Sequence, residues 1–443
     1  TIVFKTATGA TLIGNADGER TVFTGDQNGN NNPDSGDLNR LMRFQSNTAD
    51  GNSANAVVLE NIDFTCVFTN TNDQAMTVGA LMVDNSGDVK VCGCRFYGCW
   101  ADGEQGGAAV HLYRSTVHFT DCDFRNNSAN YRGGAVRLRS NDKNKGITTF
   151  ERCSFTGNTN YHTYGGAIFF AHGKTLNIIN STIAGNTAAT LGGAIFFNGA
   201  DDTYSRTVNI VNSTIAGNKA TDGGGQIASN QDSRINIVNS IVVSKDETTS
   251  CFDFISSTAK DKFSFVSGGY NYVGSVTDAV TEPAKELQWL DSDIHGDECQ
   301  WNNIFGENTI VDGLYIIPDE FIQGASGAQV AAAVAEWGLP AGTDLSVDIA
   351  GRQRGADVTP GAYAATKGET VSIGEVYGAL DAQASIEACG NGVFMLNGVE
   401  GATVYSTSGS LVSRVAGSVV DLGSAPRGIY IVATSNGTFK VIR

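Results

Sequence analysis

Five oxygen-bearing side chains follow closely on one another near the start of the 443-residue chain. They are Asp26, Asn28, Asn30, Asp34 and Asp37. Carboxylate and amide oxygens at such intervals are ligands that Ca²⁺ prefers, so the stretch is a candidate metal loop, and calcium is the cofactor that the sequence suggests. The stretch lacks the closing glutamate of an EF-hand loop. Asn, Gly and Asp are also typical of ordinary turns, which is the interpretation we favour.

A second group of side chains suits carbohydrate. Trp100, Tyr161, His162 and Tyr164 occur in neighbouring copies of a repeat and carry flat rings with polar tips. Such rings bury an apolar face while keeping a polar edge in water, which is how sugar rings can be held. These four residues are the predicted ligand-binding site for a polysaccharide or a host glycan, although the same residues also suit plain loop decoration.

Catalytic residues cannot be named from the sequence. Glycoside hydrolysis uses two carboxylates on either side of one bond. Asp201 and Asp202 are adjacent, but no third acid occupies a matching position in the neighbouring repeats. We therefore expect a binding protein more than an enzyme. The alternatives are a polysaccharide lyase or glycoside hydrolase acting on an acidic polysaccharide, and a structural surface spacer.

The elements that position these residues come from a repeat. An apolar anchor recurs 27 to 32 residues apart, at Phe64, Phe96, Phe124, Phe155, Ile183, Ile215 and Val242. Before each anchor, two short stretches alternate apolar and polar residues, and two extra residues separate them. Alternation predicts a strand with one face inward, and the extra residues predict a corner. Such bent strands can stack coil on coil as a parallel β-helix, with the right-handed crossovers that parallel strands favour.

Other columns of the repeat have structural explanations. Paired glycines precede a third strand in several copies, for example Gly165-Gly166 and Gly192-Gly193. Amide side chains recur three residues after the anchor, where they can form a hydrogen-bonded ladder, at Asn127, Asn158, Asn186 and Asn218. Small side chains recur two residues before it, at Cys94, Cys122, Cys153, Ser181 and Ser213, where thiols act as small apolar groups. Cys251 and Cys299 are a possible disulfide.

The repeat resembles a known family. Phe124-x-x-Asn127 followed by Gly133-Gly134-Ala135-Val136, and Phe155-x-x-Asn158 followed by Gly165-Gly166-Ala167-Ile168, are similar to the repeat of polymorphic outer-membrane proteins. The resemblance covers roughly residues 55–245. It implies a right-handed β-helix displayed at or beyond a bacterial surface, as in adhesins, and it implies no particular activity.

The end of the chain resembles a type IX (Por) secretion sorting domain. The residues that carry this resemblance are Val404-Tyr405 before Ser408-Gly409, then Val420-Asp421-Leu422, Gly428-Ile429-Tyr430-Ile431-Val432 and the final Lys440-Val441-Ile442-Arg443. The resemblance implies a small β-sandwich, the type IX secretion machinery as a partner, and an extracellular or surface-attached protein.

The expected organisation is all-β. Residues 1–365 form the parallel β-helix: 1–54 as first coil and cap, 55–245 as regular repeats, and 246–365 as irregular closing coils with inserted helices, one of them near 328–337. Residues 366–383 are a linker, and 384–443 are the sorting domain. The net charge of −17 argues against nucleic-acid partners, and no apolar run is long enough for a transmembrane segment.

Overall fold

The computed structural model forms two compact units, Thr1–Lys367 and Gly368–Arg443. It describes residues 2–5, 10–15, 20–37, 40–45, 57–70, 79–140, 146–171, 173–198, 206–229, 233–245, 250–254, 264–278, 287–296, 299, 301, 305, 322–356, 358–365, 385–390, 393–397, 401–406, 411–422, 429–434 and 437–442. The predicted linker, 366–383, lies outside these residues, as do Asp201 and Asp202.

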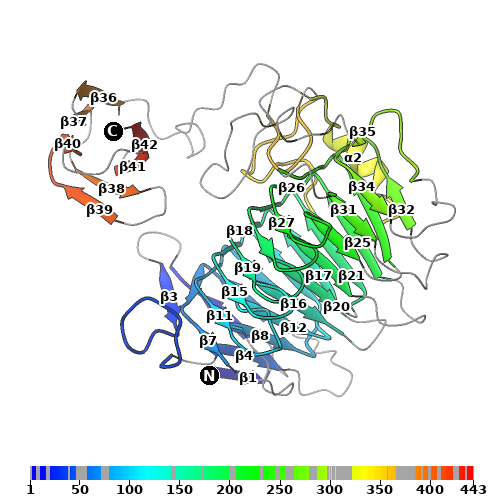
Figure 1. Ribbon diagram of the computed structural model, residues 1–443, viewed down its shortest axis with the longest axis horizontal. Helices are drawn as coiled ribbons and strands as arrows, with labels where there is room; N and C mark the ends of the chain where they lie inside the picture. The colour runs from blue at the N-terminus through cyan, green and yellow to red at the C-terminus, as the bar shows by residue number, and fades with distance from the viewer. Residues whose placement is uncertain are drawn as a thin grey trace. The chain divides into compact units, whose positions relative to one another are not determined.

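The first unit is a parallel β-helix, as the repeat predicts (Figure 1). Its coils contribute strands to three long parallel sheets and one short one. Sheet A contains β1 (Ile2–Lys5), β4 (Met42–Gln45), β8 (Leu81–Asp84), β12 (Val110–Tyr113), β16 (Val136–Arg139), β20 (Ile168–Ala171), β24 (Ile195–Asn198), β28 (Ile227–Ser229), β31 (Phe252–Phe254) and β34 (Val276–Asp278).

Two more sheets hold the paired half-strands of the repeat. Sheet B contains β2 (Ala10–Ile13), β5 (Val57–Glu60), β9 (Val89–Cys92), β13 (Val117–Thr120), β17 (Ile147–Glu151), β21 (Thr175–Ile179), β25 (Arg206–Val211), β29 (Ser233–Val238) and β32 (Ser264–Ser267). Sheet C contains β3 (Thr21–Thr24), β6 (Ile62–Thr65), β10 (Arg95–Tyr97), β14 (Asp123–Arg125), β18 (Ser154–Thr156), β22 (Thr182–Ala184), β26 (Thr214–Ala216), β30 (Ile241–Val243), β33 (Tyr272–Val273) and β35 (Ile294–His295).

A fourth ladder was not expected from the sequence. Sheet D contains six two-residue strands: β7 (Phe68–Thr69), β11 (Trp100–Ala101), β15 (Ser128–Ala129), β19 (Thr159–Asn160), β23 (Thr187–Ala188) and β27 (Lys219–Ala220). A strand of two residues is too short to produce an alternating pattern that can be distinguished from a loop. Trp100 begins one of these strands, so sheet D positions part of the predicted ligand site.

The predicted register is confirmed. The anchors pair from coil to coil on sheet C, from Phe64 with Phe96 through to Ile215 with Val242. The four phenylalanine anchors are fully buried, and the rings of Phe124 and Phe155 stack with centroids 4.4 Å apart. Burying a side chain of this size contributes about 1.5–3 kcal/mol relative to exposure, so the anchor column is a main source of stability.

The amide ladder is also confirmed. The Nδ2 atom of Asn158 donates to Asn186 Oδ1 at 2.8 Å, and Asn186 donates likewise to Asn218. The ladder ends where Asn218 donates to Gln226 Oε1 at 2.7 Å. These side chains are buried, and their bonds satisfy polar groups that water does not reach.

The small-residue column is inward, and its thiols are unpaired. Cys94, Cys122 and Cys153 are buried, and burial raises the pKa of Cys94 and Cys122, so they remain neutral thiols. Cys251 and Cys299 are both reduced thiols, so the disulfide considered for them is not formed. Cys251 instead contacts Ser244, and the thiol of Cys299 donates to the carbonyl of Ile294 at 3.0 Å.

A segment after the last coil returns to cover earlier ones. We call residues 322–356 and 358–365 the cover segment. It contains α2 (Gly327–Ala333), which begins with a capping box formed by Ser326 and Gln329 and ends four residues short of the expected 328–337. Val330 and Val334 pack on outward apolar residues of sheet B: Ile179, Val211 and Val238. Arg354 is buried and donates to the Gly361 carbonyl at 2.7 Å, which fixes the end of the segment.

The second unit contains two antiparallel sheets. One comprises β36 (Ser385–Gly390), β37 (Val393–Asn397) and β40 (Val419–Asp421), and the other comprises β38 (Ala402–Ser406), β39 (Leu411–Val415), β41 (Ile429–Thr434) and β42 (Gly437–Ile442). Buried residues of both sheets, including Phe394, Val404 and Val432, form one core, so the predicted fold class is confirmed. Within the described parts of the chain, no helix has the length and hydropathy needed to cross a membrane.

Candidate functional site

The carboxylate groups of the predicted calcium loop accept hydrogen bonds from other residues of the same loop. Asp26 accepts the backbone N–H groups of residues 29, 30 and 31, and Asp37 accepts those of Gln27 and Asp34. The amides of Asn28 and Asn30 both donate to Asp34 Oδ2. The Gly36 N–H and these two amides hold the pKa of Asp34 below its usual value. Among the described residues, no group of three His, Cys, Asp or Glu side chains is placed to hold a metal, and calcium binding here stays a prediction.

The four predicted ligand-binding residues divide into two places. Trp100 and Tyr161 stack with ring centroids 5.6 Å apart at an angle of 20°, although two coils separate their strands, and Tyr161 is 49% exposed. His162 is exposed beside this pair and lies 5.5 Å from the ring of Tyr131. Tyr164 instead stacks on Phe196, in an apolar cluster on the outer side of sheet A. The aromatic surface therefore comprises Trp100, Tyr161, Tyr131 and His162.

Polar side chains border this aromatic surface. Asn130 donates to the Asp102 carboxylate at 2.7 Å; Asp102 is exposed to solvent and Asn130 is half-buried. They occupy the register positions one coil and two coils before Tyr161. A stacked aromatic surface with adjacent carboxylate and amide groups can hold a sugar ring by its face and its hydroxyl groups at the same time.

A pocket of about 300 Å³ lies on the same coils, at the corner between sheets B and C. Its lining includes Arg20, Arg95, Arg125 and Arg152 together with Asp121 and Asp123. Arg95 and Asp123 are register partners on adjacent strands of sheet C, with Asp63 before them and Ser154 after them. Alternation turns all four outward while the anchors turn inward.

The carboxylates around the pocket are held by arginines. Asp63 accepts from Arg20 Nε at 2.6 Å and lies 3.9 Å from Arg95 Nη1. Asp123 pairs with Arg125 and accepts from Ser154 Oγ at 2.5 Å. Burial raises the pKa of Asp123 despite the neighbouring arginine.

Asp121 accepts two bonds from Arg152. Its Oδ1 and Oδ2 atoms lie 2.7 Å and 2.9 Å from Nε and Nη2 of that guanidinium. The paired carboxylate raises the pKa of Arg152, so the charge on this arginine is permanent. A fork of this kind fixes the geometry of both side chains as well as their charges.

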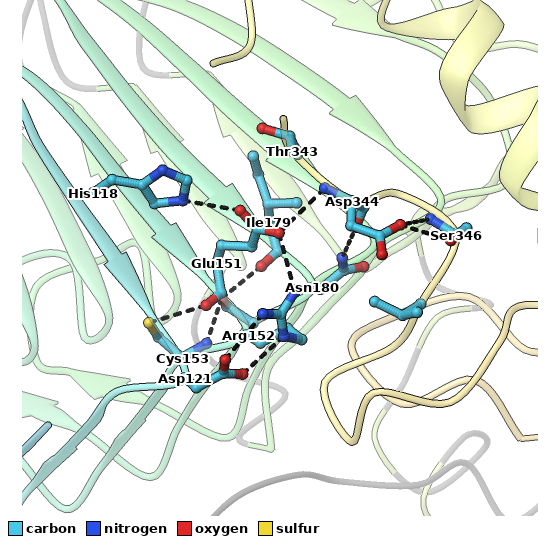
Figure 2. A network of polar contacts seen from close by, with 12 residues as sticks. His118, Asp121, Glu151, Arg152, Cys153, Ile179, Asn180, Thr343, Asp344 and Ser346 are labelled. Atoms are coloured by element: carbon cyan, nitrogen blue, oxygen red, sulfur yellow. Dashed lines mark hydrogen bonds and ion pairs between the residues drawn. The ribbon is translucent and has the colours of Figure 1, made fainter. Parts of the chain in front are cut away.

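Figure 2 shows how this corner is joined to the cover segment. Glu151 is buried and accepts from Arg152 Nη1 at 3.1 Å and from the backbone N–H of Asp344 at 3.2 Å, and its other oxygen lies 2.9 Å from His118 Nε2 (Figure 2). Asn180 donates to the Asp344 carbonyl at 2.9 Å. The cover segment is thereby fixed at the edge of the pocket, to which it contributes Ile349.

Sequence reasoning missed the arginine pocket. The anchor, amide and small-residue columns of the repeat were used, but the outward position just before each anchor was not. That column contains Asp63, Arg95, Asp123 and Ser154, and its alternating charges were the available signal. Arg20 and Ile349 come from the first coil and the cover segment, and no periodicity connects them to the repeat.

Residues 79–264 match the family model described as the right handed beta helix region. This match agrees with the right-handed parallel β-helix that the strands of this part of the chain form. No curated protein and no solved structure matches the chain.

Proposed function

We propose that the protein is an extracellular or surface-attached β-helix that binds a glycan without catalysis, in the manner of an adhesin. The observation that carries the proposal is the stack of the half-buried Trp100 and the exposed Tyr161, with Asp102 and Asn130 beside it. Aromatic faces and hydrogen-bonding groups on one rigid surface are what a sugar ring requires, and the stacked coils supply the rigidity.

Binding is favoured over catalysis because of how the nearby carboxylates are held. Asp121 and Asp123 both line the pocket, and each is engaged by an arginine. A general base needs an oxygen that can accept a proton from the substrate, and an arginine fork opposes that role. The proposed location follows from the resemblance of residues 384–443 to a type IX sorting domain, which makes the secretion machinery the proposed partner.

A glycan array followed by isothermal titration calorimetry tests the proposal. We expect Tyr161→Ala to weaken binding of the selected glycan about tenfold, roughly 1.4 kcal/mol, because the exposed ring face is lost. Tyr113→Ala is the matched control, since Tyr113 ends β12 on sheet A of the same coils. Equal affinity of the two variants would place the glycan elsewhere, and no bound glycan on the array would favour a structural spacer.

One observation supports the alternative of a polysaccharide lyase or glycoside hydrolase. Asp121 and Asp123 line one pocket in different environments, and the pKa of the buried Asp123 is raised. A carboxyl group whose pKa is raised by burial, with a second carboxylate nearby, is the usual arrangement for glycoside hydrolysis. Product release from acidic and neutral polysaccharides, measured as new reducing ends and as unsaturated ends, tests this. Turnover that Asp123→Asn abolishes would replace binding by catalysis as the function.

A further inference from the structure

We propose that the arginine pocket is a subsite for the anionic substituent, a carboxylate or a sulfate, of an acidic saccharide. This inference rests on the proposed function and names its ligand class. The first observation is the composition of the lining, with four arginines and two aspartates around one cavity of about 300 Å³. The chain as a whole carries a net charge of −17, so a cavity lined by four arginines stands out against an acidic protein.

The four arginines have different tasks. Arg152 directs Nε and Nη2 to Asp121 and Nη1 to Glu151, and Arg20 donates to Asp63 and to the Gly93 carbonyl. These two guanidinium groups form hydrogen bonds and ion pairs with residues around the pocket, and these contacts fix their positions. Arg95 is different, because its ion pair with Asp63 spans 3.9 Å and its side chain is 52% exposed.

Arg125 is the second guanidinium group that a ligand can reach. Its side chain is 39% exposed, and Asp123 fixes it from one side. Arg95 and Arg125 lie on adjacent strands, at positions that are diagonal in the register. Two arginines about one coil apart can approach a planar carboxylate or a sulfate together, and guanidinium groups bind such oxyanions through paired hydrogen bonds.

The position of the pocket connects it with the aromatic surface. Arg95 and Trp100 belong to the same coil and are five residues apart, so at most about 17 Å of backbone separates them. Tyr97 lies between them and is 36% exposed. One oligosaccharide can therefore reach the stacked rings and the arginine pocket at once.

The charge of the whole protein limits the class of anion. A densely charged polyanion such as a nucleic acid would meet the negative field of the remaining surface at most of its length. A saccharide with separate charges places one group in the pocket and neutral hydroxyl groups elsewhere. Uronate residues and sparsely sulfated sugars have this property.

The test compares three oligosaccharides of equal length by calorimetry with the full chain: an oligogalacturonide, a sulfated galactan fragment and a neutral galactan fragment. We expect the acidic saccharides to bind more tightly than the neutral one. Arg95→Gln should weaken acidic binding about tenfold and leave the neutral affinity unchanged. Preference for one acidic saccharide identifies its substituent as the group that the pocket takes. Raising the salt from about 0.05 M to about 0.5 M should reduce the acidic affinity, since screening increases.

Two further variants keep the result decisive. Arg125→Gln combined with Asp123→Asn removes the second arginine without leaving a buried charge, and it should also weaken acidic binding. Arg234→Gln removes an exposed arginine of β29 outside the pocket and should change nothing. Equal binding of neutral and acidic saccharides, or unchanged acidic binding in both pocket variants, would overturn the subsite but leave the proposed function standing. Failure of all three saccharides to bind would contradict the proposed function as well.

Discussion

His111 is a polar side chain of sheet A that is buried without a hydrogen-bond partner for its ring in the described part of the chain. It turns away from the core yet is fully buried, and neither ring nitrogen has a hydrogen-bond partner among the described residues. Arg137, Arg139 and Arg40 are the charged groups that act on it. Burial first, and then these arginines, lower the pKa of His111 well below its usual value, so the folded protein holds the ring neutral.

His111→Met should therefore reduce the loss of stability in mild acid. As the pH falls below about 6.5, the unfolded chain takes up a proton on this histidine and the folded chain does not. The free energy of unfolding thus falls by up to about 1.4 kcal/mol per pH unit from this group alone. Methionine fits because Met82 occupies the same register position on the preceding coil. Urea unfolding near pH 7.5 and near pH 5 measures the change.

The matched control for this experiment is His162→Gln. His162 is exposed in the folded protein, so this variant removes a histidine without removing a buried imidazole. An unaltered dependence in His111→Met, with His162→Gln behaving like wild type, would show that the buried imidazole is not the group that responds to acid.

At the level of the coil, the paired glycines allow neighbouring turns to touch. A Cβ atom built on Gly166 would lie 2.1 Å from the Gly193 carbonyl oxygen and 2.7 Å from the carbonyl carbon of Thr187. Gly134 and Gly193 have equally close backbone neighbours on the next coil. At these three positions glycine is required because the next coil leaves no space for a Cβ atom. The backbone angles at these positions are not left-handed.

Gly166→Ala should lower the free energy of unfolding by about 3 kcal/mol, the upper part of the range for overpacking, because rigid backbone atoms cannot move aside. Gly355→Ala is the matched control, because its nearest neighbour would be a Val358 methyl group at 3.9 Å. Thermal unfolding of both variants provides the measurement. Similar stability of the two would mean that the coils separate at little cost.

The repeat was predictable because its signal is local and recurs. The anchors from Phe64 to Val242 and the amides from Asn127 to Asn218 repeat a pattern of side-chain types at each coil, and both columns pair as expected. The coil path continues to β35 although the pattern fades after residue 245, because backbone pairing persists when glycine pairs and amides are absent. The arginine pocket had only a weaker signal, because the residues before the anchors change in charge from coil to coil, and Arg20 and Ile349 lie outside the repeat.

At the scale of the whole molecule, contacts between residues distant in sequence determine which outer faces of the coils are covered. The cover segment binds coils that precede it by up to 193 residues, as in the bond from Asp344 to Glu151. It lies over the outer faces of β21, β25 and β29, and it ends beside the pocket. Sequence periodicity describes the stack, but it cannot say where a later segment returns, so the position of the site had to come from the structure.

The second unit contains the proposed sorting domain for secretion, and we expect secretion to require that this unit is folded. Val432 is fully buried in the core of this unit, whereas Val412 is 38% exposed on β39. An unpaired carboxylate in the core costs several kcal/mol, so Val432→Asp should unfold the unit, and Val412→Asp should leave it intact. The full chain is expressed behind a general secretion signal in a bacterium with the type IX pathway, and surface and periplasmic fractions are compared. We expect Val432→Asp, like deletion of residues 384–443, to retain the protein in the periplasm, while Val412→Asp reaches the surface. Surface delivery of the deleted chain would remove the type IX machinery as a partner without affecting the glycan-binding proposal, because the aromatic surface and the pocket belong to the first unit.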